Sequence, residues 1–192
     1  MSLGRANWAE EIQAPAATVI KVPGGVDLHQ LSMLKVNPAT ALLMLERYVA
    51  LQPGDWVIQN AGNSAVGRYL IQLAVAKGLH TVNVVRRAEL ADELRDIGAD
   101  LVLVDGDDLP ERVRAEIGDA NLPLGIDAVA GLGTLRLGGC LSDGGTVVNY
   151  GLLSGEPCQL TADMVVFKSI TLTGFWLAKL LGSMAPAEVG AL

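Results

Sequence analysis

Two glycines, Gly62 and Gly67, enclose four short side chains: Asn63, Ser64, Ala65 and Val66. An apolar run at residues 56–59 precedes this stretch and a segment with helical spacing at 65–77 follows it, which is the order of a dinucleotide-binding motif. Gly62 permits a tight exit from the strand, the small Ser64 lets the backbone approach a pyrophosphate, and Gly67 lets helix and strand pack closely. Amides at the start of the helix would then face the phosphates. The motif predicts a pyrophosphate site, and the alternative is a turn that only connects a strand to a helix.

Two arginines, Arg86 and Arg87, follow the next apolar run at residues 81–85. An NAD-preferring site places an acidic residue near this position, against the ribose 2′-hydroxyl, and this sequence has none there. Guanidinium groups match a 2′-phosphate in charge and in geometry. The pair therefore predicts NADPH as cofactor, whereas the alternative is two solvated charges at a strand end.

Other reactive side chains stand alone in the sequence. Cys140 and Cys158 are eighteen positions apart without His neighbours, so we expect neither a disulfide framework nor a metal site. The two histidines, His29 and His80, and Ser142 are too isolated to form a nucleophile with its base. We therefore expect chemistry to depend on a bound cofactor.

Composition restricts the partners and the compartment. A formal net charge of -7 argues against nucleic acid, because such binding requires clustered Lys and Arg. Every apolar run is shorter than the roughly 18 residues needed to span a membrane. The first residues lack a basic region followed by an apolar core, so we expect no signal peptide and a cytoplasmic location, with organellar targeting of a longer parent left open.

Short apolar runs alternate with amphipathic segments from residue 37 onward. The runs lie at residues 56–59, 81–85, 101–104, 126–130, 146–150 and 170–175, and the helical segments at 37–49, 65–77, 88–97, 109–117, 134–141 and near 164–168. Runs without polar alternation indicate strands covered on both faces. The sequence therefore predicts an α/β fold, a doubly wound parallel six-stranded Rossmann sheet in the order 3-2-1-4-5-6. Residues 8–36 are interpreted as a strand, at 18–22, and loops from the end of a preceding domain.

Several sequence blocks together are similar to the zinc-independent medium-chain dehydrogenase/reductase superfamily, and within it to the trans-2-enoyl-thioester reductases. The blocks are residues 35–41, 52–55, 58–67, 84–86, 98–100, 144–146, 149–151 and 174–177. A looser similarity to quinone oxidoreductases runs along the same segments. The resemblance implies that residues 1–34 are the end of a truncated GroES-like catalytic domain and that residues 35–192 form the NAD(P)-binding Rossmann domain, without its C-terminal return.

The resemblance also implies roles for matched residues. It places Asn37 and Thr40 near the nicotinamide, and Arg86, Arg87 and Ala88 at the 2′-phosphate, although the family often has Arg-Asp-Arg there. The remaining implied nicotinamide-side residues are Tyr150, Gly151, Leu152, Leu153, Phe175, Trp176, Leu177 and Ala178, of which Trp176 also borders the acyl pocket. The family's proton-donating tyrosine belongs to the preceding domain, so no catalytic residue is expected in this sequence.

The leading hypothesis is NADPH-dependent reduction of the carbon–carbon double bond of a 2-enoyl thioester, carried by CoA or acyl carrier protein. The alternatives are an NADPH-dependent quinone oxidoreductase and a non-catalytic NADPH-binding module or sensor. The resemblance further implies a homodimer formed through the edge strand at residues 170–175.

Overall fold

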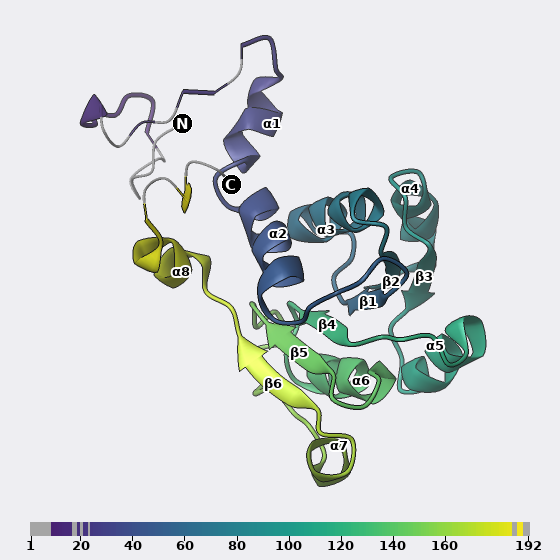
Figure 1. Ribbon diagram of the computed structural model, residues 1–192. Coiled ribbons are helices and arrows are strands. Elements are labelled where there is room, and N and C mark those ends of the chain that lie inside the picture. The colour runs from purple at the N-terminus through teal and green to yellow at the C-terminus, as the bar shows by residue number, and fades with distance from the viewer. Residues whose placement is uncertain (1–8, 17–18, 20, 23, 186–187, 190–192) are drawn as a thin grey trace.

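The computed structural model describes residues 9–16, 19, 21–22, 24–185 and 188–189. They form a six-stranded sheet in the order β3-β2-β1-β4-β5-β6 with every neighbouring pair parallel, which confirms the predicted doubly wound topology (Figure 1). The prediction of no signal peptide rests largely on residues outside the described part of the chain, as do two of the five residues of the predicted strand at 18–22. Of the other three, Val19 forms an isolated bridge and residues 21 and 22 are not in a strand. No helix in the described residues is long and apolar enough to cross a membrane.

The strands are β1 (Trp56–Gln59), β2 (His80–Val85), β3 (Leu101–Val104), β4 (Leu124–Asp127), β5 (Thr146–Asn149) and β6 (Thr171–Gly174). The α-helices are α1 (Leu28–Met33), α2 (Asn37–Arg47), α3 (Ala65–Ala76), α4 (Ala91–Arg95), α5 (Leu109–Ile117), α6 (Leu132–Cys140), α7 (Ala162–Val166) and α8 (Leu177–Ser183). A short 3₁₀ turn, η2 (Ala88–Leu90), precedes α4.

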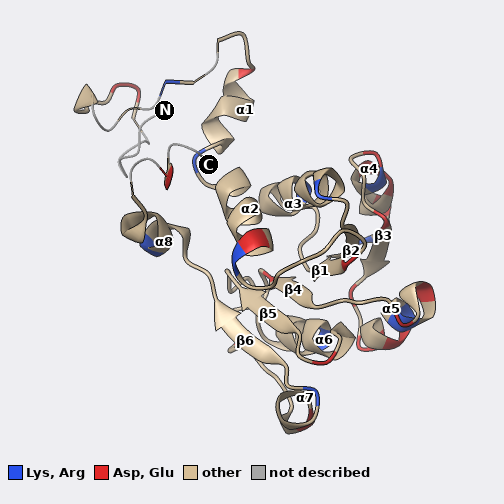
Figure 2. Cartoon of the chain, viewed as in Figure 1, with Lys and Arg blue, Asp and Glu red and all other residues tan. Residues whose placement is uncertain are grey.

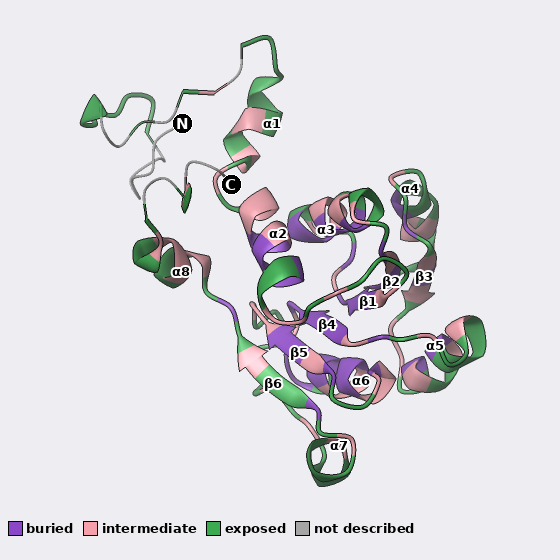
Figure 3. Ribbon diagram, viewed as in Figure 1, coloured by how far each residue is buried: buried purple, intermediate pink, exposed green. Residues whose placement is uncertain are grey.

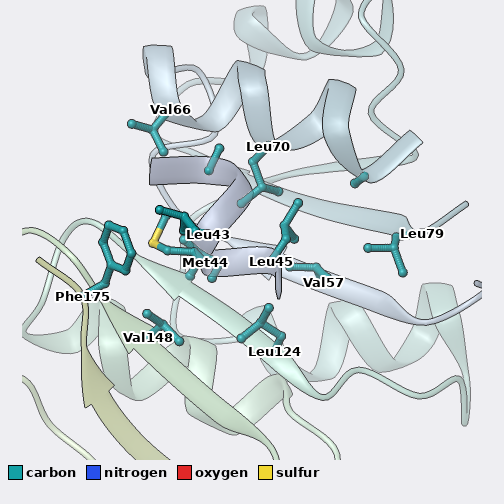
Figure 4. Close-up of a cluster of buried hydrophobic side chains, with 13 residues drawn as sticks. Leu43, Met44, Leu45, Val57, Val66, Leu70, Leu79, Leu124, Val148 and Phe175 are labelled. Carbon is teal, nitrogen blue, oxygen red and sulfur yellow. The ribbon is translucent and has the colours of Figure 1, made fainter. Parts of the chain in front are cut away.

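Helices cover both faces of the central strands, as the uninterrupted apolar runs predict. On one face, α2 and α3 pack on β1, β4 and β5 through a cluster that includes Met44, Leu70 and Val148 (Figure 4). On the other face, a second cluster joins α5 and α6 to alternate residues of the same sheet, among them Ile58 and Val147. Because β1 and β4 lie at the centre and are buried, the carboxyl ends of these two strands have fixed positions relative to each other (Figure 3).

The edge strand β6 differs from the central strands. Its residues are mostly exposed, and Leu172 is 38% exposed (Figure 3). Neither β5 nor β6 contains a charged residue (Figure 2). The outer edge of the sheet at β6 is therefore an uncharged, open strand within the described residues.

Three predictions of local structure were wrong, and the limits of the other elements predicted from residue 37 onward lie within two residues of the predicted ones. The strand predicted at 126–130 ends at Asp127, because Ala130 adopts a φ of 66° and the Asp127 carboxylate accepts the amides of Val129 and Ala130. The helix predicted at 88–97 is divided into η2 and α4. Residues 8–36 were expected to contain no helix, yet α1 forms there with its first amides capped by Asp27.

Candidate dinucleotide-binding site

The turn between β1 and α3 is as tight as its glycines predict. A Cβ placed on Gly67 would lie 2.8 Å from the carbonyl carbon of Gly62 and 3.0 Å from the oxygen of Ala61. A Cβ on Gly62 would lie 3.1 Å from the Cβ of Asn83 on β2. The side-chain oxygen of Ser64 accepts the Gly67 amide at 3.1 Å and caps α3. The two glycines therefore allow the start of α3 to lie directly against the end of β1.

The amides at this turn are available to an anion. Among the described residues, the backbone amides of Asn63, Ala65 and Val66 make no hydrogen bond to the protein, and Asn63 and Ala65 are exposed. The turn lies beyond the carboxyl end of β1, where the strand order reverses between β1 and β4. Ligands of doubly wound sheets bind at this position, and the unpaired amides at the N-terminus of α3 suit a pyrophosphate.

The end of β2 lies beside the turn, since the Gly62 amide donates to the Val84 carbonyl at 3.1 Å. Arg86, Arg87 and Ala88 follow β2 and are all exposed. Arg87 lies 3.4 Å from Glu89 on the surface, and Arg86 makes no ion pair with any residue that the structure describes. Both guanidinium groups can therefore be directed to a phosphate next to the turn without breaking a buried contact.

The structure brings Tyr150, at the end of β5, to the same turn. Its phenol interacts with the side chain of Ser64. Burial raises the pKa of the Tyr150 phenol, while the interaction with Ser64 acts in the opposite direction, so the phenol is neutral near pH 7. After Tyr150 the chain becomes exposed, with Leu152 and Leu153 72% and 75% exposed. This loop offers apolar surface at the site.

Other predicted residues occupy different environments. Asn37 begins α2 and is half-buried, whereas Thr40 in the same turn is buried. The Phe175 ring is also buried, in an edge-to-face contact with Tyr48 at 6.4 Å between ring centres. By contrast, Trp176 is 67% exposed and precedes α8, which begins with the predicted residues Leu177 and Ala178. Thr40 and Phe175 are therefore buried in this structure, whereas Trp176 is exposed to solvent.

A buried polar network at the same edge was missed by the sequence analysis. Asp127 is fully buried at the end of β4 and is surrounded by hydrogen-bond donors from Asn60, Thr134 and Asn149. A second buried group on β1 and β2 links Gln59 to Asn83 at 2.7 Å and to the Gly67 carbonyl at 3.0 Å. The signal for both was present in the sequence: Gln59, Asp127 and Asn149 end otherwise apolar runs, and Asn83 interrupts one.

No metal site accompanies these groups in the described part of the chain. No three His, Cys, Asp or Glu side chains there are placed to hold a metal ion together. Cys140 and Cys158 are separate free thiols. Burial raises the pKa of the Cys140 thiol to about 12, which keeps it protonated and unsuited to metal binding near neutral pH.

The strand order and the glycine turn define a Rossmann domain of the doubly wound class. Residues 65–189 match the family described as zinc-binding dehydrogenase. The chain is 38% identical over 190 residues to the mitochondrial enoyl-[acyl-carrier-protein] reductase of Rattus norvegicus, covering 96% of this chain and 51% of that protein. It belongs to the zinc-independent medium-chain dehydrogenase/reductase superfamily and is close to its enoyl reductases.

Solved structures agree with this assignment. One is Etr1p, an enoyl thioester reductase from Candida tropicalis, solved in complex with NADP and crotonyl-CoA. It has a TM-score of 0.80 at 30% identity, over 87% of this chain and 48% of the other. A structure described as a putative NADPH:quinone reductase from Bacillus thuringiensis has a TM-score of 0.84 at 25% identity, over 93% of this chain and 54% of the other. The chain thus spans about half the length of the relatives that it matches.

Proposed function

We propose that this chain binds NADPH at the carboxyl edge of its sheet, as part of an enzyme that reduces the double bond of a 2-enoyl thioester. The observation that carries the proposal is the turn between Gly62 and Gly67, with its unpaired amides beside Arg86 and Arg87. The identity to enoyl reductases and the structural likeness to a protein solved with NADP and crotonyl-CoA support it.

The strand order suggests how NADPH would lie. The half of the sheet with β1, β2 and β3 holds the adenosine end, with the diphosphate at residues 63–66 and the 2′-phosphate at residues 86–88. The half with β4, β5 and β6 then receives the nicotinamide end, near Tyr150 and the exposed Trp176. Asn37 at the start of α2, together with residues 151–153, would complete that end.

When bound, NADPH supplies the hydride that adds to the β-carbon of the enoyl thioester. The residues of this chain bind and orient the cofactor and cover one side of it. None of its three tyrosines is assigned as the proton donor. The Tyr48 hydroxyl donates to the Gly174 carbonyl, Tyr69 packs from α3 against the core, and the Tyr150 phenol interacts with Ser64. We assign the donor to a catalytic domain of which residues 1–34 form the end, with residues 35–192 as the cofactor domain.

A binding titration followed by a turnover assay tests this proposal. NADPH fluorescence should change on titration with the chain, and the affinity for NADPH should exceed that for NADH. The full-length parent should oxidise NADPH in the presence of crotonyl-CoA. Equal affinity for the two nucleotides would contradict the assignment of Arg86 and Arg87.

A quinone is the second candidate substrate, favoured by the TM-score of 0.84 to the structure described as a putative quinone reductase. Oxidation of NADPH by the parent with a quinone but not with crotonyl-CoA would establish it. Binding of NADPH by the parent without turnover of either substrate would instead identify a non-catalytic module or sensor.

We further propose that two copies pair through β6. The amides of Thr171 and Phe175 point inward, to carbonyls of Gly145 and Asn149, so the amide of Leu172 points to the open edge. Leu172→Pro removes that outward donor, whereas Leu172→Ala shortens the side chain and keeps it. In sedimentation experiments, Leu172→Pro should weaken a dimer more than Leu172→Ala. A wild-type monomer at high concentration would refute the pairing.

We place the protein in the reducing environment of the cytoplasm, although the curated relative from rat is named as mitochondrial. Cell fractionation with an antibody to the chain decides between the two compartments.

A further inference from the structure

The Asp127 carboxylate stands at the end of β4 and joins three segments of the candidate site. We propose that Asp127 is a positioning residue, which holds the loops after β4 and β5 in the shape that receives the nicotinamide half of the cofactor. This inference rests on the proposed function. The Asp127 network is defined as Asp127 with Asn60, Thr134 and Asn149.

One carboxylate oxygen fixes the loop after β4. Oδ1 of Asp127 accepts the Asn60 side-chain amide at 2.6 Å and the backbone amides of Val129 and Ala130 at 2.9 and 3.0 Å. The Asn60 side chain accepts in turn from the Ala128 amide at 2.7 Å. Asn60 directly follows β1 and lies two residues before Gly62, so this oxygen links the end of β1 to the first residues beyond β4.

The other oxygen fixes the loop after β5. Oδ2 of Asp127 accepts the Thr134 hydroxyl at 2.6 Å and the Asn149 side-chain amide at 3.0 Å. The same Asn149 amide donates to the Gly151 carbonyl at 2.8 Å, inside the loop predicted to contact nicotinamide. The carboxylate therefore positions Gly151 through a single intermediate, Asn149.

The two loops are also packed directly against each other. A Cβ on Gly151 would lie 2.7 Å from the Ala128 carbonyl oxygen, so no larger residue fits between the loops. The amides of Leu153 and Ser154 donate to the carbonyls of Ala128 and Val129 at 3.2 and 2.9 Å. A shift of the segment at 128–130 would therefore move the segment at 151–154 with it.

This arrangement predicts an effect confined to one end of the cofactor. The Asp127 network contacts the half of the sheet formed by β4 and β5, and reaches the other half only through Asn60. The turn amides at residues 63–66 and the arginines after β2 make no hydrogen bond with it among the described residues. Loosening the network should weaken binding of the nicotinamide end and leave the adenosine end unchanged.

Asp127→Asn is the most selective test. An amide in this place keeps one oxygen, which can still accept from Asn60, Val129 and Ala130. Its NH₂ group would then face the Asn149 NH₂ group, and two donors repel each other. We expect the Asn149 amide to move away from this contact, which weakens its bonds to the backbone carbonyls of Asp127 and Gly151. The loop after β5 is released while the shape and volume of the side chain are preserved.

Two ligands report on the two ends of the site in the 192-residue chain. For Asp127→Asn, we expect the Kd for NADPH to rise about tenfold, the usual scale for leaving a buried polar group unpaired. The Kd for adenosine 2′,5′-bisphosphate, which lacks the nicotinamide half, should stay within about twofold. Asn149→Ala keeps the Asp127 carboxylate and removes only the donor that links it to the Gly151 carbonyl. It should give the same separation and serves if Asp127→Asn does not fold.

The control is Ser142→Ala, at the opposite end of the sheet. It removes the hydrogen bond at 2.9 Å from the Leu122 amide to the Ser142 hydroxyl, a loss of packing and hydrogen bonding far from the site. Both ligands should bind this variant as they bind the wild type. Equal weakening of both ligands by Asp127→Asn, or weakening of neither, would overturn the positioning role.

Amide hydrogen exchange tests the network without any cofactor. In Asp127→Asn, exchange should accelerate at residues 128–130 and 151–154 relative to Ser142→Ala. Unchanged exchange there would refute the network's control of the loops. Failure of the wild-type chain to bind NADPH would refute the proposed function instead, so the two ideas fail through different measurements.

Discussion

Replacing Gly67 by alanine tests the geometry on which the candidate site depends. The added Cβ would stand 2.8 Å from the Gly62 carbonyl carbon, and ordinary contacts between carbon atoms begin near ~3.5 Å. The turn and α3 must therefore separate by roughly 0.7 Å, at a cost of about 2 kcal/mol for overpacking. For a chain of this length, that loss lowers the melting temperature by about 4–8 °C.

The same displacement should weaken cofactor binding. Moving the turn amides by roughly 0.7 Å lengthens a hydrogen bond of ~2.9 Å to a phosphate beyond its useful range. We expect the affinity of Gly67→Ala for NADPH to fall by about tenfold or more, since one lost charged hydrogen bond is worth about 1.5–3 kcal/mol. Thermal unfolding and fluorescence titration measure the two effects.

Gly182→Ala provides a matched control, because the same methyl group enters open space in α8. Alanine favours a helix over glycine, so the melting temperature of this variant should stay level or rise slightly. If Gly67→Ala kept both its wild-type melting temperature and its NADPH affinity, the close approach of turn and helix would be wrong.

Three further predictions concern charge and ionisation. Arg86→Gln should weaken NADPH about tenfold and leave NADH unchanged in fluorescence titrations, because only the 2′-phosphate loses its partner; equal weakening would contradict the assignment. Burial raises the pKa of the Cys140 thiol to about 12, so at pH 7.5 it should react with iodoacetamide far more slowly in the folded chain than in urea. Mass spectrometry of the Cys158→Ser variant, which leaves Cys140 as the one cysteine of the sequence, measures the two rates. Burial raises the pKa of Tyr150 above its usual value of 10.0, so the free energy of unfolding should fall as the pH rises above 10. Tyr150→Phe should make this fall shallower in denaturant titrations. An unchanged dependence of the free energy of unfolding on pH would count against the buried phenol.

The strands and helices were predictable because short apolar runs without polar alternation recur between amphipathic segments. This pattern is typical of a parallel sheet with helices on both faces. The limits of β1, β3 and α5 match the predicted ones residue for residue, and the strand order is the expected one. Two of the errors fall where side chains compete with the backbone for hydrogen bonds. Asp127 ends β4 early, and Asp27 starts a helix in a segment without apolar periodicity.

By itself, the sequence determined the glycine turn and the arginines after β2, since both depend on residues close together along the chain. Only the tertiary structure decided which distant residues meet there. Tyr150 reaches Ser64, and Asp127 gathers Asn60 and Asn149, because the parallel pairing of β1, β4 and β5 brings their carboxyl ends to one edge. A buried carboxylate is stable only when donors from several strands converge on it, and no local sequence pattern specifies that convergence.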